Sequence, residues 1–239
     1  MERTDILRGL AARGADTSPQ RLSDLAAELG IPVADLFVVA GHPVPSELLP
    51  PARDAEATGE FAYRVSHCGH AQLTALEEFV RSLPRVATLE PPAPSAQPDS
   101  PCGGPAGSGG STVFNGLLRN RGFGIDELPF LGLSRSTLRT MSSRWEPSPH
   151  RRFQLCAVAG PLGWTLPDLF AVVDEPYAEE LRPVVLCRHV GWVLEAAVPL
   201  TTAQLVEAAE EADRLSARED QGVWQPVSQG SVAECPDFA

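Results

Sequence analysis

GIPVADLFVVAGHPVPSELLP, residues 30–50, has a close copy later in the chain, GWTLPDLFAVVDEPYAEELRP at 163–183. The two stretches align without a gap. They share a first glycine, an Asp-Leu-Phe triplet, a valine, a proline, a Glu-Leu pair and a final proline at the same spacings. Further along, Ala-Gln-Leu occurs at 71–73 and again at 203–205. Self-similarity of this kind predicts an internal duplication.

Apolar residues recur at helical spacing around the first copy. Leu22, Leu25 and Leu29 lie three or four residues apart, and Gly30 follows them, as is common just after the end of a helix. Two further helices are expected between residues 52 and 83. The composition, 43% hydrophobic and 6% aromatic, suits helices packed around leucine, alanine and valine. We therefore predict an all-α protein of two pseudo-repeated helical units.

The composition also predicts the boundaries of these units. Residues 84–112 are rich in proline, glycine and serine, and few of them can enter a core, so we predict a flexible linker. The first unit then covers residues 1–83 and the second covers 113–218, each ending in a helical hairpin. Residues 219–239 lack helical periodicity and are predicted to be a disordered tail. Two similar units in one chain usually pack about a pseudo-two-fold axis or copy the interface of an ancestral homodimer.

Positive charge is concentrated in one part of an acidic chain. The formal net charge is -12, yet residues 119–152 hold seven arginines against Asp126, Glu127 and Glu146, a local charge of +4. An acidic body is repelled by a nucleic-acid duplex, so the overall balance argues against non-specific binding. A single basic segment on such a protein is typical of a protein that turns one face towards phosphates.

The two copies differ in length at one place. LAARG at 10–14 resembles LRNRG at 118–122, but the second copy then has about thirty residues before its next matching helix, where the first copy needs only a few. The additional residues include GLSRSTLRTM at 132–141, which puts two arginines and several hydroxyl side chains on one short predicted helix. This insertion is the candidate functional segment.

Residues 112–173 resemble the Cro/Xre-type helix-turn-helix family of repressors, and the matching pieces occur in the family's order. A first helix ends at Arg121-Gly122, a second covers 125–131, Gly132-Leu133-Ser134 forms the turn, 135–142 is the recognition helix, and two more helices cover 153–162 and 167–173. The resemblance implies that the second unit contains a helix-turn-helix that binds double-stranded DNA. The first copy resembles only the flanking helices, so we expect it to be a degenerate unit that does not read DNA.

In this family the recognition helix enters the major groove, where an arginine can bond to O6 and N7 of one guanine. Ser134 would cap that helix, and a helix N-terminus favours a phosphate. One such helix gives little affinity alone, so we expect a homodimer that places two recognition helices about one DNA turn apart. The predicted DNA-binding residues are Ser134, Arg135, Ser136, Thr137, Arg139 and Thr140, with Arg119, Arg121, Arg144, Arg151 and Arg152 on the DNA backbone.

Two other classes of function remain open. A protein-interaction or scaffold module with a decayed helix-turn-helix is favoured by Pro129, which falls inside the predicted second helix, and by the acidic composition. The hairpin over 181–218, with Glu207, Glu210, Glu211 and Asp213 in its second arm, could as a unit contact a protein partner. A regulator that responds to a small ligand would need a pocket between the hairpins, and the sequence shows no clear one.

We expect no enzyme, cofactor or metal. The chain has no Ser-His-Asp order, phosphate loop or paired-carboxylate motif. His67, Cys68 and His70, or Cys187 and His189, could be metal ligands, but no CxxC accompanies them and ordinary side-chain roles are favoured. No apolar stretch approaches the roughly 20 residues of a membrane span. The N-terminus also lacks an apolar signal core, so we expect a cytoplasmic protein with no membrane partner.

Overall fold

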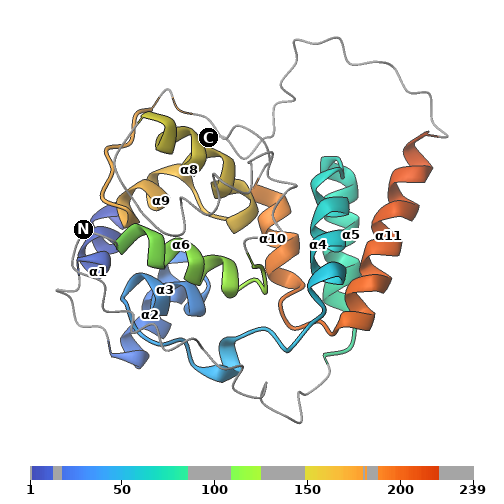
Figure 1. Cartoon of the computed structure of the whole chain (residues 1–239), viewed down its shortest axis with the longest axis horizontal. Coiled ribbons are helices and arrows are strands. Elements are labelled where there is room, and N and C mark those ends of the chain that lie inside the picture. The colour runs from blue at the N-terminus through green and yellow to red at the C-terminus, as the bar shows by residue number, and fades with distance from the viewer. Residues whose placement is uncertain are drawn as a thin grey trace.

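The computed structural model describes residues 2–12, 18–85, 109–124, 149–179, 181 and 188–220 (Figure 1). Within these ranges the chain is helical and has no strand, which confirms the all-α prediction. No single helix in the described part is long and apolar enough to cross a membrane. Among the described helices, only α8 (Pro149–Leu162) and α9 (Leu166–Val172) together are apolar and long enough for such a span, and they are bent by 111°.

The helices are α1 (Arg3–Ala11), α2 (Pro19–Leu29), α3 (Val33–Val39), the 3-10 helix η1 (Ser46–Leu48), α4 (Ala55–Ser66), α5 (His70–Ser82), α6 (Gly109–Arg119), α8 (Pro149–Leu162), α9 (Leu166–Val172), α10 (Arg188–Ala196) and α11 (Thr202–Asp220).

The ends of these helices follow local sequence chemistry. The Asp54 side chain caps α4 by accepting a hydrogen bond from the backbone N–H of Ala57, and Thr165 caps α9 in the same way. Gly30 and Gly163, which are equivalent in the repeat, have φ angles of 58° and 70°. Glycine adopts this left-handed conformation without strain, so both positions can stop a helix and turn the chain.

Several predicted boundaries differ from the structure by a few residues. Helix α6 begins at Gly109, so residues 109–112 of the predicted linker are helical. Helix α11 ends at Asp220, two residues inside the predicted tail. Glycine lowers helix propensity at the start of α6, but Phe114 and Leu117 of the same helix are buried, and tertiary packing overrides a weak local preference.

Helices of the N-terminal half (residues 2–85) pack mainly on helices of the C-terminal half (residues 109–220). Helix α1 packs on α9, and α6 packs on α3 (Figure 1). The sequence alignment makes α1 equivalent to α6 and α3 equivalent to α9, so this contact occurs twice with the halves exchanged. The hairpins follow the same pattern, because α4 packs against α11 and α10 packs against α5.

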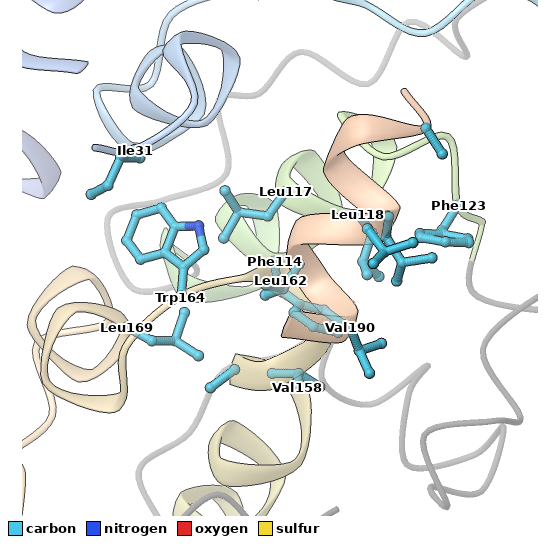
Figure 2. Packing of buried hydrophobic residues seen from close by; sticks show 14 of the residues in the cluster. Ile31, Phe114, Leu117, Leu118, Phe123, Val158, Leu162, Trp164, Leu169 and Val190 are labelled. Atoms are coloured by element: carbon cyan, nitrogen blue, oxygen red, sulfur yellow. The ribbon is translucent and has the colours of Figure 1, made fainter. Parts of the chain in front are cut away.

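One hydrophobic cluster joins the two halves. Leu22 and Phe170 are completely buried in it, although they come from different halves. Figure 2 shows the part of this cluster that contains Ile31 of the N-terminal half together with Trp164 and Leu169 of the C-terminal half. Apolar burial stabilises a fold by about 25 cal/mol per Å². Each half therefore depends on the other for much of its stability.

Candidate nucleic-acid interface

The predicted turn and recognition helix lie outside the residues that the structure describes. The described chain stops at Gly124, just after α6, and resumes at Pro149, where α8 begins. The structure therefore gives the geometry of the two helices on either side of this segment. The predicted DNA-binding residues outside the described ranges are Ser134, Arg135, Ser136, Thr137, Arg139, Thr140 and Arg144.

Two predicted phosphate-binding arginines are accessible on these flanking helices. Arg119 is exposed at the end of α6, and no hydrogen bond or ion pair from elsewhere in the described chain engages its guanidinium. The Arg152 side chain on α8 is 41% exposed, and its Nε lies 4.0 Å from Oε2 of the buried Glu175. Arg151 belongs to the first turn of the same helix. Arg119 and Arg152 thus remain able to meet a phosphate.

Arg121 cannot bind the DNA backbone, and the prediction for this residue is wrong. It is only 3% exposed, and its guanidinium forms a two-pronged ion pair with Asp35 of α3. Nη2 donates to Oδ2 at 2.9 Å and Nη1 donates to Oδ1 at 3.1 Å. The same guanidinium donates to the carbonyls of Leu117 in α6 and Leu162 at the end of α8. Arg121 therefore ties α3, α6 and α8 together inside the protein.

Asp35 is fully buried, and its charge is satisfied by groups from the other half of the chain. Besides Arg121, the Asn120 amide donates to Oδ1 at 2.9 Å and the Trp164 indole N–H donates to Oδ2 at 2.8 Å. A buried carboxylate is costly unless it is paired and hydrogen-bonded in this way. The network consequently fixes the end of α6 against the start of α3.

A second bridge uses the equivalent acceptors of the other copy. Asp168, which aligns with Asp35, accepts from Nε of Arg3 with both carboxylate oxygens at 2.8 Å. Arg3 also donates through Nη1 to the carbonyl of Leu29, which aligns with Leu162. We call the Arg3–Asp168 and Arg121–Asp35 pairs the crossed arginine bridges. Each bridge joins one half of the chain to the other.

The repeated Ala-Gln-Leu sequence forms a further pair of contacts between the halves. The Gln72 carbonyl oxygen accepts from the backbone N–H three residues before it at 2.6 Å, and its amide donates to the Leu215 carbonyl. Gln204 accepts from the N–H three residues before it at 3.0 Å and donates to the Pro84 carbonyl at 2.6 Å. Each glutamine thus caps its own helix and holds the end of the opposite hairpin.

Arg53 adds a clamp between the hairpins and the bridge at Asp35. Its Nη2 donates to the Arg121 carbonyl at 2.9 Å, and its Nη1 donates to the Ala197 carbonyl at 3.1 Å. Burial lowers the pKa of Arg53 to about 10, so the guanidinium is still charged at neutral pH. No sequence pattern indicates this role of Arg53, because its partners are carbonyls that have no signature in the sequence.

Helices α6 and α8 carry only basic charge, whereas other helices expose acidic side chains. Helices α6 and α8 carry Arg119, Arg151 and Arg152 and no acidic residue. Helix α11 lies with α4 and α5 on the opposite side from α8 (Figure 1). The exposed acidic residues on these three helices are Glu56, Glu60, Glu78, Glu207, Glu210 and Asp213.

The histidine and cysteine side chains considered as metal ligands have other contacts. His67 packs on Tyr63 with ring centroids 4.4 Å apart. His189 is buried, and its Nε2 lies 2.9 Å from Oε2 of Glu77, while its Nδ1 is 3.4 Å from that of His70. Within the described ranges no three donor side chains are arranged to hold a metal ion. Cys187 lies outside those ranges.

Comparison with known proteins gives no relative for this chain. No protein-family model matches it, and neither the curated proteins nor the solved structures contain a significant match.

Proposed function

We propose that the protein is a sequence-specific, DNA-binding regulator of transcription that reads the major groove with residues 134–144 and acts as a homodimer. The observation that supports this most is the purely basic charge of α6 and α8, the two helices that flank the segment 125–148. Arg119 is exposed on one flank and Arg152 is partly exposed on the other, on helices without acidic residues. The acidic side chains of α4, α5 and α11 lie on the opposite side of the molecule.

This distribution suits a protein that approaches DNA in one orientation. Phosphates attract the arginines of α6 and α8 and repel the acidic side chains of other helices such as α11, so the acidic body helps to orient the molecule. Arg119 and Arg152 would bind phosphates and set the register, while Arg135 and Arg139 would donate to guanine edges. Phosphate contacts hold the protein in place, and base contacts supply the sequence preference.

The crossed arginine bridges support the proposal through rigidity. Arg121 joins the end of α6 to α3 and to Leu162 at the end of α8, so the helices on both sides of residues 125–148 are held by one guanidinium. A reading element mounted on a rigid frame binds more precisely than one carried by mobile helices. Loss of the Arg121–Asp35 pair would therefore weaken DNA binding through the fold rather than through a phosphate contact.

Selection from a random DNA pool with the purified full chain, followed by titration of the enriched duplex, tests the proposal. We expect the Arg135→Ala/Arg139→Ala protein to lose at least about tenfold in affinity, because one bidentate arginine–guanine contact contributes about 1–3 kcal/mol. The matched control is Arg8→Ala/Arg214→Ala, which removes the same charge from α1 and α11. Both control arginines are about half exposed and pair with acidic residues of their own helices, and Arg8 also lies 3.6 Å from Asp174.

The same experiments can also contradict the proposal. The DNA proposal fails if no sequence is enriched, if salt does not weaken binding, or if the control variant loses as much affinity as the reading variant. The homodimer part fails separately if sedimentation finds one chain on the enriched duplex. Two chains on a site with half-sites about ten base pairs apart are the expected result.

A protein-interaction module is the second candidate, and the surface of α4 and α11 favours it. These helices pack together and carry the exposed large hydrophobic side chains Tyr63 and Val206, at 52% and 46% exposure. Exposed apolar groups beside acidic residues are typical of a contact surface with a polar rim. This candidate is preferred if stable complexes form with a protein and never with any DNA pool.

A further inference from the structure

A cavity of about 530 Å³ lies where the two halves meet, and its volume is that of a pocket for a small molecule. It is bounded by the start of α3, by η1, by the ends of α5 and α6, and by α10 with the turn that follows it. Val33, Leu48, Leu83 and Val198 supply the accessible apolar wall, and Trp192 adds an aromatic side chain. The sequence could not reveal this cavity, because its lining comes from distant parts of the chain.

The charged groups in the wall are not equally available to a ligand. Arg121 is committed to Asp35, and Arg81 pairs with Glu77 at 2.7 Å. Glu195 of α10 is different, because it is half buried and no other described residue gives its carboxylate a hydrogen bond or a close ion pair. Glu47 and Arg85 also border the cavity, but both are exposed to water. The uncompensated charge inside the cavity is therefore negative.

Burial makes the ionised form of Glu195 costly. Desolvation raises the pKa of this carboxyl above its ordinary value, and the charges of Asp35 and Glu77 act in the same direction. Arg121 and Arg81 oppose the rise but do not cancel it. A cation that entered the cavity and contacted Glu195 would supply the missing partner and remove this penalty.

We propose that the cavity binds a small organic ammonium compound, with its charged group on the Glu195 carboxylate and its apolar body against Val33, Leu48, Leu83 and Val198. The carboxylate gives specificity for the cation, since a charge-assisted hydrogen bond in a partly desolvated site is stronger than a neutral one. The apolar wall supplies most of the buried area. The cavity thus combines the apolar lining and the few polar groups that ligand sites usually have.

The position of the cavity also links it to the proposed DNA binding, and this part of the inference rests on that function. Asn120 and Arg121 border the cavity and directly follow α6, which leads into residues 125–148. A ligand that binds only while the Arg121–Asp35 network is intact would raise the population of the intact frame, which is the state proposed to bind DNA. The ammonium compound would then act as an effector that changes affinity for DNA.

Nuclear magnetic resonance titration of the full-length protein with three probes of one shape tests the site without DNA. The probes are phenylbutylamine, the neutral phenylbutanol and the anionic phenylbutyrate, and the signal is the indole N–H of Trp192, assigned with Trp192→Phe. We expect the amine to bind at least about tenfold more tightly than the alcohol. Glu195→Gln should abolish this preference, and Glu210→Gln, an exposed site on α11, should leave it unchanged.

The pH dependence of the amine supplies a second readout. The charged groups that act on Glu195 are Arg121, Asp35, and Arg81 and Glu77 of α5, and the exposed Glu47 and Arg85 border the same cavity. Below the raised pKa of Glu195 its carboxyl is neutral and attracts an ammonium weakly, whereas above that pKa it is ionised. The probe stays protonated throughout this range, so its affinity should increase as the pH rises through the Glu195 pKa, and Glu195→Gln should remove the dependence.

Several results would overturn the proposed ammonium site. They are equal binding of amine and alcohol, tighter binding of phenylbutyrate, an unchanged amine preference in Glu195→Gln, or no shift of the Trp192 signal with any probe. Because no DNA is present, each of these leaves the DNA proposal standing. Failure of the DNA selection would equally leave the ammonium site standing. A bound amine that leaves DNA affinity unchanged would refute only the effector role.

Discussion

Asp35 and Asp168 occupy equivalent positions but differ in what their removal would leave behind. Asp35→Ala would leave Arg121 as an unpaired cation that is 3% exposed, which should cost about 3–5 kcal/mol of unfolding free energy. Asp168→Ala would leave Arg3, whose side chain is 38% exposed and can turn to water, so we expect about 1.5 kcal/mol. Urea unfolding followed by circular dichroism measures both values. Equal losses would show that burial of the arginine does not control the cost.

Single residues were predictable where their chemistry is local. Gly30 was expected to end a helix, and its left-handed backbone conformation does so. Arg121 was assigned to a surface because it is one of several arginines near the inserted segment. Its partner Asp35 is 86 residues away, and no local pattern indicates that pairing. Charge read along a sequence cannot distinguish a buried arginine from an exposed one.

Close packing of α10 on α8 makes Gly191 sensitive to any added side chain. A Cβ at Gly191 would overlap the backbone nitrogen of Gly163 and the carbonyl oxygen of Gly160, and backbone atoms cannot turn aside. We expect Gly191→Ala to lower stability by about 1–3 kcal/mol or more through overpacking.

Gly9 of α1 is the matched control, since a Cβ there meets nothing within 4 Å. Replacing a helical glycine by alanine in open space should raise stability by about 0.5–1 kcal/mol. Thermal unfolding of the two alanine variants should therefore shift the midpoint in opposite directions. A midpoint for Gly191→Ala at or above that of the unchanged protein would contradict the predicted overlap.

The existence of most described helices could be predicted, but their contacts could not. Leucine spacing predicted α2, and two helices were expected between residues 52 and 83, where α4 and α5 lie. The sequence around Gly191 does not indicate that α10 packs closely on α8 at this residue, because such a contact depends on which helix lies opposite. The predicted phosphate contacts of Arg119 and Arg152 remain predictions, since exposure permits them but does not demonstrate them.

The two halves should fold together and not separately. Each half supplies the partners for the other's buried aspartate, core and hairpin ends, so a chain divided within residues 86–108 should give two fragments with little stable helix. Mixing the fragments should restore the circular dichroism of the whole chain. A fragment 1–96 that unfolds cooperatively by itself, at the midpoint of the full chain, would contradict this interdependence.

At the scale of the whole molecule, the sequence indicated helices and repetition but not the cavity. Repetition is visible because equivalent residues can be aligned by eye. A cavity is defined by what several elements leave unfilled, and Leu48, Glu195 and Leu200 have no common pattern. The sequence shows no clear pocket between the hairpins, because periodicity reports on one element at a time.

The crossed arginine bridges have matching acceptors but unmatched donors. Asp35 and Asp168 align, as do Leu29 and Leu162, yet Arg3 lies at the first residue of its helix and Arg121 lies just beyond the last residue of its own. In a symmetric dimer encoded by one gene, any change of donor would appear on both sides at once. In a single polypeptide the two bridges can change independently. A substitution can therefore alter the donor of one bridge while the other bridge stays the same.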